Sequence, residues 1–283
     1  MSIIEQALDK NRAKQAQAKR TRPLRTGEAT GTGDTAIRAA LIDADARIVP
    51  LAVSIDSAAC RERRILLQDS NETEQSAVAA YRMLRTRLLH RARTNGWSVI
   101  AVTSAGANDG KTLTVLNLAL SMSREKSRDV VLLDLDMRNP SVCRALDVHP
   151  PHDLSEYLER STDPRQLFFS VGSDNLLIAG CVKASENASE LLASPRFEEL
   201  IERLKRGTVE PIILIDLPPV LLTDDALVLA PKVDAVLLVA SEGTTGRANF
   251  AKALDVLAEF PVIGVVLNRA SETASGYEYA YGQ

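Results

Sequence analysis

The stretch from Val102 to Thr112 constrains the fold of this chain more than any other feature of the sequence. An apolar run at 98–101 precedes it, and an amphipathic run at 113–121 follows it. A buried strand, a loop of small residues ending in Gly-Lys-Thr, and a helix are the parts of a phosphate-binding loop. A chance Gly-Lys-Thr at a helix start is the alternative. The pattern predicts a strand–loop–helix unit that binds a nucleoside triphosphate.

Each residue type in this loop has an expected task. Gly110 lets the backbone wrap around the phosphates, Lys111 reaches the β- and γ-phosphates, and Thr112 offers its hydroxyl to Mg²⁺. The N-terminus of the following helix points free N–H groups at the anion. Ala105 replaces the first glycine of the usual pattern and is still small. The predicted nucleotide-binding residues of the loop are Ser104, Ala105, Gly106, Ala107, Asn108, Asp109, Gly110, Lys111, Thr112 and Leu113.

Two further apolar runs end in carboxylates. Residues 130–133 lead into Asp134 and Asp136, and residues 212–215 lead into Asp216. A carboxylate at the end of a buried strand lies beside the phosphate loop, where Mg²⁺ binds through one or two carboxylates plus phosphate oxygens. The alternative is that these aspartates cap the turns that follow them. We therefore predict a metal site formed by Thr112, Asp134 and Asp216.

Strand and helix patterns alternate from about residue 71. The expected strands are 98–103, 129–134, 174–179, 211–216, 234–240 and 262–267, and the expected helices include 72–93, 111–124, 153–160, 186–206 and 246–259. Several strands are continuous Val/Ile/Leu runs, as in a sheet that is covered on both faces. The alternation predicts an α/β fold with a doubly wound, mostly parallel sheet. With the phosphate loop, the alternation predicts a P-loop NTPase of the deviant-Walker type.

The two ends of the chain differ from this central part. Residues 1–70 are interpreted as an N-terminal extension with a short helix and a basic linker, and 71–270 as the P-loop domain. Residues 271–283 form a tail that carries Tyr277, Tyr279 and Tyr281, three of the five tyrosines. Fully extended, it spans about 40 Å, which could present a tyrosine to a neighbouring subunit. The alternatives are an edge strand with alternating aromatic residues, or a sticky disordered tail that has no function.

Charge and cysteine usage limit the partners and the compartment. The net charge of −3 argues against general nucleic-acid binding. Residues 1–30 hold seven Lys/Arg and three Asp/Glu, so this segment either docks on a membrane activator or anionic membrane, or is a solvated tail. Three cysteines without Cys-x-x-Cys spacing fit a reducing compartment. No apolar run approaches the roughly 18 residues of a membrane span, and no signal-peptide pattern is present. We expect a cytoplasmic protein.

Taken together, these motifs resemble the bacterial tyrosine kinases of capsule and exopolysaccharide synthesis. The resemblance covers about residues 72–283. It rests on 104–112, Asn117-Leu118-Ala119, 133–140, Asp216-Leu217-Pro218-Pro219, Asp225-Ala226, 264–268 and the tyrosine-bearing tail. The Asp-Leu-Pro-Pro variant and the opening Met1-Ser2-Ile3-Ile4-Glu5 look most like the members associated with exosortase-type loci.

The resemblance implies roles for individual residues. It places Lys111 at the phosphates and Asp134 near the transferred phosphate, with Asp136 in support. It places Asp216 at the hydration shell of Mg²⁺ and Asn268 near the nucleotide base. The implied catalytic residues are therefore Lys111, Asp134, Asp136 and Asp216.

The resemblance also implies an activity and a setting. The activity is ATP-dependent phosphoryl transfer to tyrosine with Mg²⁺ as cofactor, and the acceptors are Tyr277, Tyr279 and Tyr281. This autokinase would regulate polysaccharide synthesis and export as a homo-oligomer. A membrane chain-length regulator would activate it and recruit it to the inner face of the cell membrane.

One departure from the family leaves two other functions open. The family carries Glu-x2-Arg-x2-Arg in subunit contacts, but Ala79 precedes Arg82 and Arg85 here. The departure argues against ring assembly and keeps open a nucleotide-sensing adaptor that transfers no phosphate. The alternative for both arginines is a solvated helix face. The second possibility is a partitioning-type positioning ATPase. Such proteins usually carry a lysine where this chain has Gly106, which counts against it.

Overall fold

Within the described residues, which are 48–67, 74–150, 152–160, 163–207 and 209–270, eight strands form one sheet. The strand order in this computed structural model is β1-β4-β5-β3-β6-β2-β7-β8, and every neighbouring pair is parallel except β4 and β5. The strands are β1 (Leu51–Ala52), β2 (Val99–Ser104), β3 (Val130–Asp134), β4 (Phe169–Ser170), β5 (Leu176–Ala179), β6 (Ile212–Asp216), β7 (Ala235–Ser241) and β8 (Val262–Asn268). The predicted doubly wound, mostly parallel sheet is confirmed.

The central strands bury side chains on both faces of the sheet. In β2, Val99 and Ala101 belong to one apolar cluster, while Ile100 and Val102 belong to the cluster on the opposite face. Alternate residues of a strand point to opposite faces, so a continuous apolar run needs a cover on each side. This explains why these strands read as unbroken Val/Ile/Leu runs.

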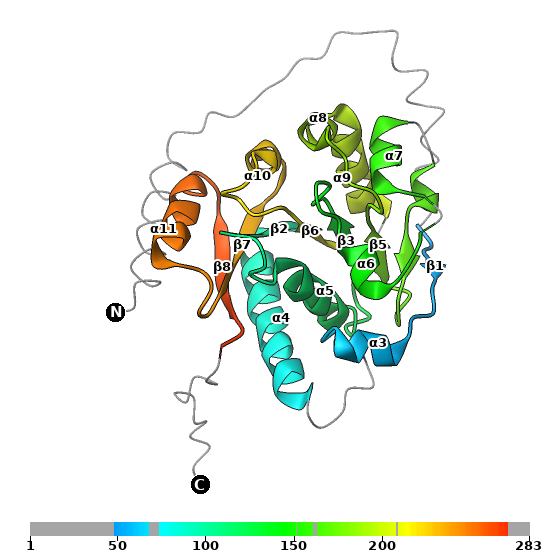
Figure 1. Ribbon diagram of the computed structural model, residues 1–283. Helices are drawn as coiled ribbons and strands as arrows, with labels where there is room; N and C mark the ends of the chain where they lie inside the picture. Colours follow the sequence, from blue (N-terminus) through cyan, green and yellow to red (C-terminus); the bar gives the residue numbers. More distant parts are fainter. Residues whose placement is uncertain (1–47, 68–73, 151, 161–162, 208, 271–283) are drawn as a thin grey trace.

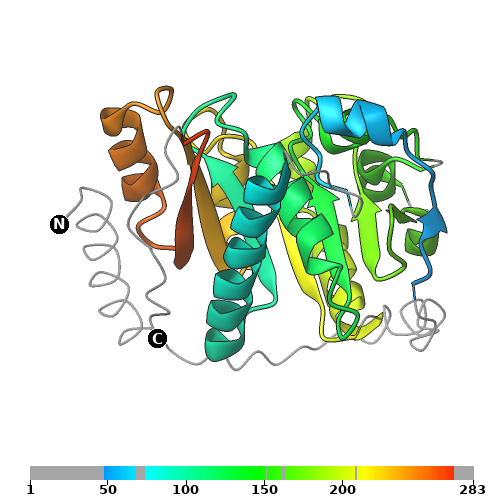
Figure 2. The same cartoon turned by 90° about the horizontal axis from the view of Figure 1, so that it is seen from below.

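Helices supply the two covers, as Figures 1 and 2 show. The first layer packs α3, α4, α5 and α6 on one face, and the second packs α7, α8, α9, α10 and α11 on the other. Their bounds are α3 (Ser57–Glu62), α4 (Gln75–Asn95), α5 (Lys111–Met122), α6 (Val142–Leu146), α7 (Leu154–Glu159), α8 (Ala188–Ala193), α9 (Pro195–Gly207), α10 (Asp225–Leu229) and α11 (Arg247–Val256). Short 3₁₀ turns cover Pro164–Gln166 and Ala230–Lys232. No helix among the described residues is both long enough and apolar enough to span a membrane.

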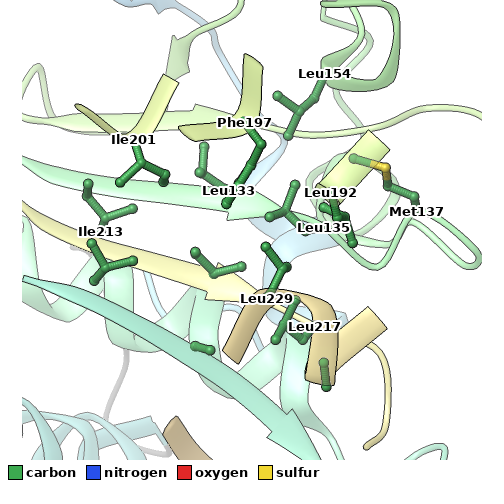
Figure 3. Close-up of a cluster of buried hydrophobic side chains, with 14 of the residues drawn as sticks. Leu133, Leu135, Met137, Leu154, Leu192, Phe197, Ile201, Ile213, Leu217 and Leu229 are labelled. Atoms are coloured by element: carbon green, nitrogen blue, oxygen red, sulfur yellow. The ribbon is translucent and has the colours of Figure 1, made fainter. Parts of the chain in front are cut away.

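The apolar core between the sheet and the second helix layer lies next to the strand ends that carry the acids. Figure 3 shows Leu133, Leu135, Met137 and Leu217 in one cluster with Phe197 from α9 and Leu229 from α10. All six side chains are buried, and the first four flank the predicted catalytic aspartates in the sequence. The packing therefore holds the backbone on either side of each acid.

The expected elements agree with the structure except at one helix. Each of the six expected strands is present, with its ends shifted by two residues or fewer. The expected helix at 186–206 is instead two helices, α8 and α9, which meet at Ser194 and Pro195. Ser194 has an extended backbone, with ψ of 149°. A residue before proline is pushed out of the helical region, which explains the break.

Residues 48–67, which the sequence analysis counted with the N-terminal extension, are built into the fold. Leu51 and Ala52 pair with β4 at the edge of the sheet. Ile48, Cys60 and Ile65 are buried in the two cores. The earlier residues, with the expected short helix and basic linker, lie outside the described part of the chain.

Candidate nucleotide-binding and catalytic site

The phosphate loop connects β2 to α5 as the sequence predicted. β2 ends at Ser104 and α5 begins at Lys111. Gly110 is the residue before the helix, with φ of 87°, and a Cβ atom there would collide with the side-chain nitrogen of Asn268. Glycine is therefore required both by the backbone angle and by the close approach. No side chain caps the helix, so its first N–H groups remain for an anion.

Internal hydrogen bonds fix the shape of this loop. The carboxylate of Asp109 accepts from the backbone N–H of Gly106 at 3.0 Å and from the hydroxyl of Thr245 at 2.6 Å. Ser104 Oγ donates to the carbonyl of Gly106 at 2.7 Å, and Asn268 Nδ2 donates to the carbonyl of Asp109 at 3.0 Å. Asp109 thus braces the loop from inside. Thr245 follows β7, and the sequence analysis missed it because nothing local marks it as a partner of Asp109.

The remaining loop residues differ in exposure. Ala105 is buried at the start of the loop, while Ala107 and Asn108 are exposed at its tip. Asn108 has φ of 62°, a left-handed angle that asparagine tolerates better than most residues. Leu113 is half-buried and packs against the apolar cluster of the first layer. The tip therefore faces solvent while both ends of the loop are anchored.

Lys111 lies among acids from two strands. Its Nζ donates to Asp136 Oδ2 at 2.7 Å and lies 3.7 Å from Asp216 Oδ1. The side chains of Lys111 and Asp136 are 12% and 5% exposed, and that of Asp216 is fully buried. We call Lys111, Asp134, Asp136 and Asp216 the Lys111 cluster. Because β3 and β6 are neighbours, Asp134 and Asp216 are register partners at the same edge of the sheet.

Thr112 connects the phosphate loop to the strand that ends in Asp216. Its hydroxyl donates to Asp216 Oδ2 at 2.6 Å and lies 3.0 Å from the hydroxyl of Ser141. The pairing of a loop threonine with a strand-end aspartate is the arrangement that holds Mg²⁺ in P-loop proteins. Ser141 was not predicted, because it follows β3 in a loop without a recognisable motif.

Asp134 is held by backbone N–H groups. Its Oδ2 accepts from Ser141 and Val142 at 2.9 and 2.8 Å, and its Oδ1 accepts from Asp136 at 3.2 Å. Val142 is the first residue of α6, so the carboxylate lies at the start of that helix. The lysine donates to Asp136 and not to Asp134 in this structure. Asp134 thereby ties the loop after β3 to its own strand.

The charges of the Lys111 cluster shift one another's protonation. Burial and the neighbouring charge of Asp216 raise the pKa of Asp134 to about 7. Burial raises the pKa of Asp216 to about 6, although the ammonium of Lys111 opposes this shift. Burial also disfavours the charge of Lys111, but Asp216 and Asp136 outweigh it and raise its pKa. With three acids around one lysine, the site favours an added cation.

The residues present fit a magnesium ion that shares its ligands with a phosphate. Asp216 Oδ1 is buried and accepts no hydrogen bond among the described residues. No group of three or more His, Cys, Asp or Glu side chains that could hold a metal occurs in the part of the chain that the structure describes. Mg²⁺ does not need such a cage, because one or two carboxylates plus phosphate oxygens and water suffice. Thr112 and Asp216 are the residues placed to hold it.

A second ion-pair network borders the Lys111 cluster. Arg138 Nε donates to Asp225 Oδ2 at 2.9 Å, and its Nη2 lies 3.8 Å from Asp224. Ser189 Oγ donates to Asp225 Oδ1 at 2.6 Å. Arg138 and Asp225 were noted only as parts of motifs, and Ser189 was not noted. The network links the loop after β3 to the start of α10.

Arg82 and Arg85, the two arginines of α4 that belong to the family pattern, have different surroundings. Arg85 Nη1 donates to the carbonyl of Ser121 at 2.8 Å, and its Nε lies 3.2 Å from Glu125. Arg82 and Ala79 are exposed. A solvated helix face therefore describes Arg82, whereas Arg85 joins α4 to the end of α5. The phosphoacceptor candidates Tyr277, Tyr279 and Tyr281 lie outside the described residues.

Comparisons with known proteins place this site in a family. The sequence model of the ParA family, described as NUBPL iron-transfer P-loop NTPase, matches residues 97–278. Tyrosine-protein kinase CpsD of Streptococcus pneumoniae serotype 4 is 31% identical over 185 residues, which are 63% of this chain and 79% of that protein. The match to the family model includes the phosphate loop and the two strands that end in acids.

Solved structures agree with the sequence relatives. The VpsO kinase domain is 26% identical, with a TM-score of 0.62, and the match covers 71% of this chain and all of that domain. The kinase domain of the Escherichia coli tyrosine kinase ETK shares the fold at 24% identity, with a TM-score of 0.65 and coverage of 82% and 94%. The chain therefore belongs to the ParA-type P-loop NTPases and, within them, to the bacterial tyrosine-protein kinases.

Proposed function

We propose that this chain is an ATP-dependent protein-tyrosine autokinase that regulates the synthesis and export of an exopolysaccharide or capsule. The observation that carries the proposal is the Lys111 cluster, in which one phosphate-loop lysine lies within 3.7 Å of acids from two strand ends. The relatives are named tyrosine-protein kinases, which supports tyrosine as the acceptor. The exosortase-associated branch remains a prediction from the motifs.

ATP and Mg²⁺ are the proposed ligands of the site. The N–H groups at the start of α5 and Lys111 bind the phosphates, and Thr112 and Asp216 hold the metal. When bound, Mg²⁺ neutralises charge on the phosphates and orients them. In the present structure Lys111 is paired with Asp136. A bound triphosphate would compete with Asp136 for the ammonium group of Lys111. Asp136 would then keep the lysine side chain oriented.

Phosphoryl transfer needs positioning and charge neutralisation more than covalent help from the protein. The tyrosine oxygen forms a bond to the γ-phosphorus as the bond to the β-phosphate oxygen breaks, and the hydroxyl proton must leave. Asp134 is the candidate acceptor of this proton, because burial and Asp216 raise its pKa to about 7. A base whose pKa lies near the working pH is the most effective one.

The setting proposed for this reaction extends to the tail and to a partner. Tyr277, Tyr279 and Tyr281 are the proposed acceptors, reached within one chain or between chains of a homo-oligomer. A membrane chain-length regulator is the proposed activator, and it would bring a cytoplasmic kinase to the membrane. The basic segment at 1–30 is the candidate docking region on the kinase.

Phosphotyrosine mass spectrometry after incubation with Mg·ATP tests the proposal. We expect label on the tail tyrosines, and we expect Lys111→Met to lower it by about 100-fold or more, because the lysine neutralises charge at the transferred phosphate. Lys252→Met is the matched control, since Lys252 is exposed on α11. Hydrolysis of ATP without tyrosine label would identify a positioning ATPase. Nucleotide binding with neither reaction would identify an adaptor.

A further inference from the structure

The phosphate loop is held from two sides. β2 lies between β6 and β7 in the sheet, so the loop that follows β2 has a neighbouring strand end on each side. On the β6 side, the hydroxyl of Thr112 donates to Asp216. On the other side, Thr245 after β7 donates to the carboxylate of Asp109 at 2.6 Å, and Asn268 at the end of β8 donates to its carbonyl at 3.0 Å. All of these residues except Thr245 belong to the predicted site.

The hydroxyl of Thr245 is locked in one orientation. The backbone N–H of Ser241 donates to Thr245 Oγ1 at 2.8 Å, and the N–H of Thr245 donates to the carbonyl of Ser241 at 2.9 Å. An N–H group can only donate, so the hydroxyl oxygen accepts from Ser241 and its proton is left for Asp109. These reciprocal bonds close the turn after β7 and direct the hydroxyl at the phosphate loop.

Asp109 lies between two residues with left-handed backbone angles. Asn108 has φ of 62° and Gly110 has φ of 87°. A residue other than glycine keeps such an angle only where the surrounding contacts fix it. Asp109 is 2% exposed, and its carboxylate accepts from the N–H of Gly106 and from Thr245. Among the described residues no cation pairs with this carboxylate, so its two donors hold the loop in shape.

We propose that Thr245 is a positioning residue of the phosphate loop, which it holds through Asp109 in the shape that binds the phosphates of ATP. The proposal rests on the proposed binding of ATP at this loop. Asp109 directly precedes Gly110 and Lys111, so a displaced Asp109 moves the start of α5 with its lysine and its free N–H groups. Without the hydroxyl, a buried carboxylate oxygen lacks its donor, and the loop must rearrange to regain one. Binding then has to restore the lost order, which lowers affinity.

Nucleotide affinity tests the proposal without any phosphoryl transfer. The full chain is titrated with the fluorescent nucleotide mant-ADP in the presence of Mg²⁺. We expect Thr245→Val, which removes the hydroxyl and keeps the shape of the side chain, to raise the Kd about tenfold. We expect Thr245→Ser, which keeps the donor, to stay within about twofold of the parent chain. Thr94→Val is the matched control, because the hydroxyl of Thr94 donates to the carbonyl of His90 on α4, before β2 begins.

A double-mutant cycle shows whether Thr245 acts through Asp109. We expect Asp109→Ala to raise the Kd about tenfold or more, because it removes the acceptor of both bonds. In that background, we expect Thr245→Val to change the Kd by less than about twofold. If the hydroxyl mattered only through its bond to Ser241, its loss would weaken binding as much in this background as in the parent. Independent effects that multiply therefore overturn the assignment.

Hydrogen exchange measured without nucleotide reports on the loop itself. We expect peptides that cover residues 105–110 to exchange faster in Thr245→Val than in the parent, and peptides of β6 to exchange at the same rate. Thr245→Ala also lacks the hydroxyl and takes the place of Thr245→Val if that variant does not fold. Unchanged exchange in 105–110 in a folded variant overturns the proposal.

The outcomes separate this proposal from the one on which it rests. A parent chain that does not bind mant-ADP overturns nucleotide binding itself. A parent chain that binds, with an equal Kd in Thr245→Val, overturns only the role of Thr245. A lower Tm with an unchanged Kd gives Thr245 a purely structural role and overturns the proposal in the same way. Nucleotide binding that depends on Thr245, in a chain that labels no tyrosine, supports this proposal and contradicts the kinase function.

Discussion

Three acids around one lysine define the site at the scale of single residues. Asp134 and Asp216 are fully buried, and Asp136 is nearly so. Burial raises the pKa of both Asp134 and Asp216, and the charge of a neighbouring carboxylate adds to the shift of each. Acids with a strongly shifted pKa are more common at functional sites than elsewhere. Binding and catalysis use buried charges, which are unfavourable for folding by themselves. A bound cation would balance that charge here.

The raised pKa of Asp134 predicts how stability depends on pH. Its pKa is about 7 in the folded chain, against an ordinary value of 3.8, so the folded state holds the proton more tightly. The free energy of unfolding therefore falls as pH rises through this window, and the contribution levels off above about pH 7. We expect Asp134→Asn to flatten the pH dependence of Tm measured without nucleotide, and to abolish tyrosine labelling. Asp174→Asn, at an exposed aspartate, is the control. An unchanged slope in Asp134→Asn would contradict the assignment.

At the scale of elements, residues 48–67 are bonded to both helices that carry the site. Asn117 on α5 accepts from the N–H of Leu66 at 2.9 Å and donates to the carbonyl of Arg64 at 3.0 Å. Arg63 Nη1 donates to the carbonyl of Ala145 at 2.9 Å, in the last turn of α6. The N-terminus of α6 holds Asp134. The segment therefore braces the phosphate-loop helix and the helix whose first residue holds Asp134, the proposed catalytic residue.

Removal of the Asn117 amide tests this bracing. Asn117→Ala leaves a buried N–H and a carbonyl without their partner, and each such loss costs about 1–3 kcal/mol. We expect the free energy of unfolding to fall by about 2 kcal/mol or more in urea denaturation, and trypsin to cleave more readily in the arginine-rich stretch at 61–64. Asn249→Ala is the control, because Asn249 is exposed on α11. Equal stability of the two variants would show that the brace is dispensable.

At the scale of the whole molecule, the tyrosines fall into two groups. Tyr81 is half-buried on α4, and Tyr157 is 8% exposed on α7. The other three lie in the tail. A hydroxyl that is packed into the fold cannot enter a catalytic site without unfolding, whereas a chain terminus can. The distribution supports the tail as the acceptor region.

A triple substitution tests this distribution. We expect Tyr277, Tyr279 and Tyr281 changed together to Phe to remove self-labelling with [γ-³²P]ATP and to leave nucleotide affinity unchanged, because phenylalanine lacks the accepting hydroxyl. Tyr157→Phe, which keeps the ring in the core, is the control and should label normally. Persistent label in the triple variant would locate the acceptor at Tyr81 or Tyr157.

Local sequence patterns determined the sheet, the phosphate loop and the strand-end acids of this protein. Val99 to Thr112 encodes strand, loop and helix by its own composition. The runs that end at Asp134 and Asp216 meet at one edge, because neighbouring parallel strands bring their carboxyl ends together. The family resemblance, confirmed by the relatives, rests on these same short patterns.

Tertiary structure alone decided which groups complete the site. Three side-chain hydrogen bonds join residues that are 29 to 136 positions apart. They link Thr245 to Asp109, Ser141 to Thr112, and Ser189 to Asp225. The inclusion of residues 48–67 depends on the pairing of the edge strand β1 with β4, a two-residue strand with no periodicity to predict it. A periodic pattern is read from neighbours along the chain, whereas a hydrogen bond between distant loops depends on packing that no single segment encodes.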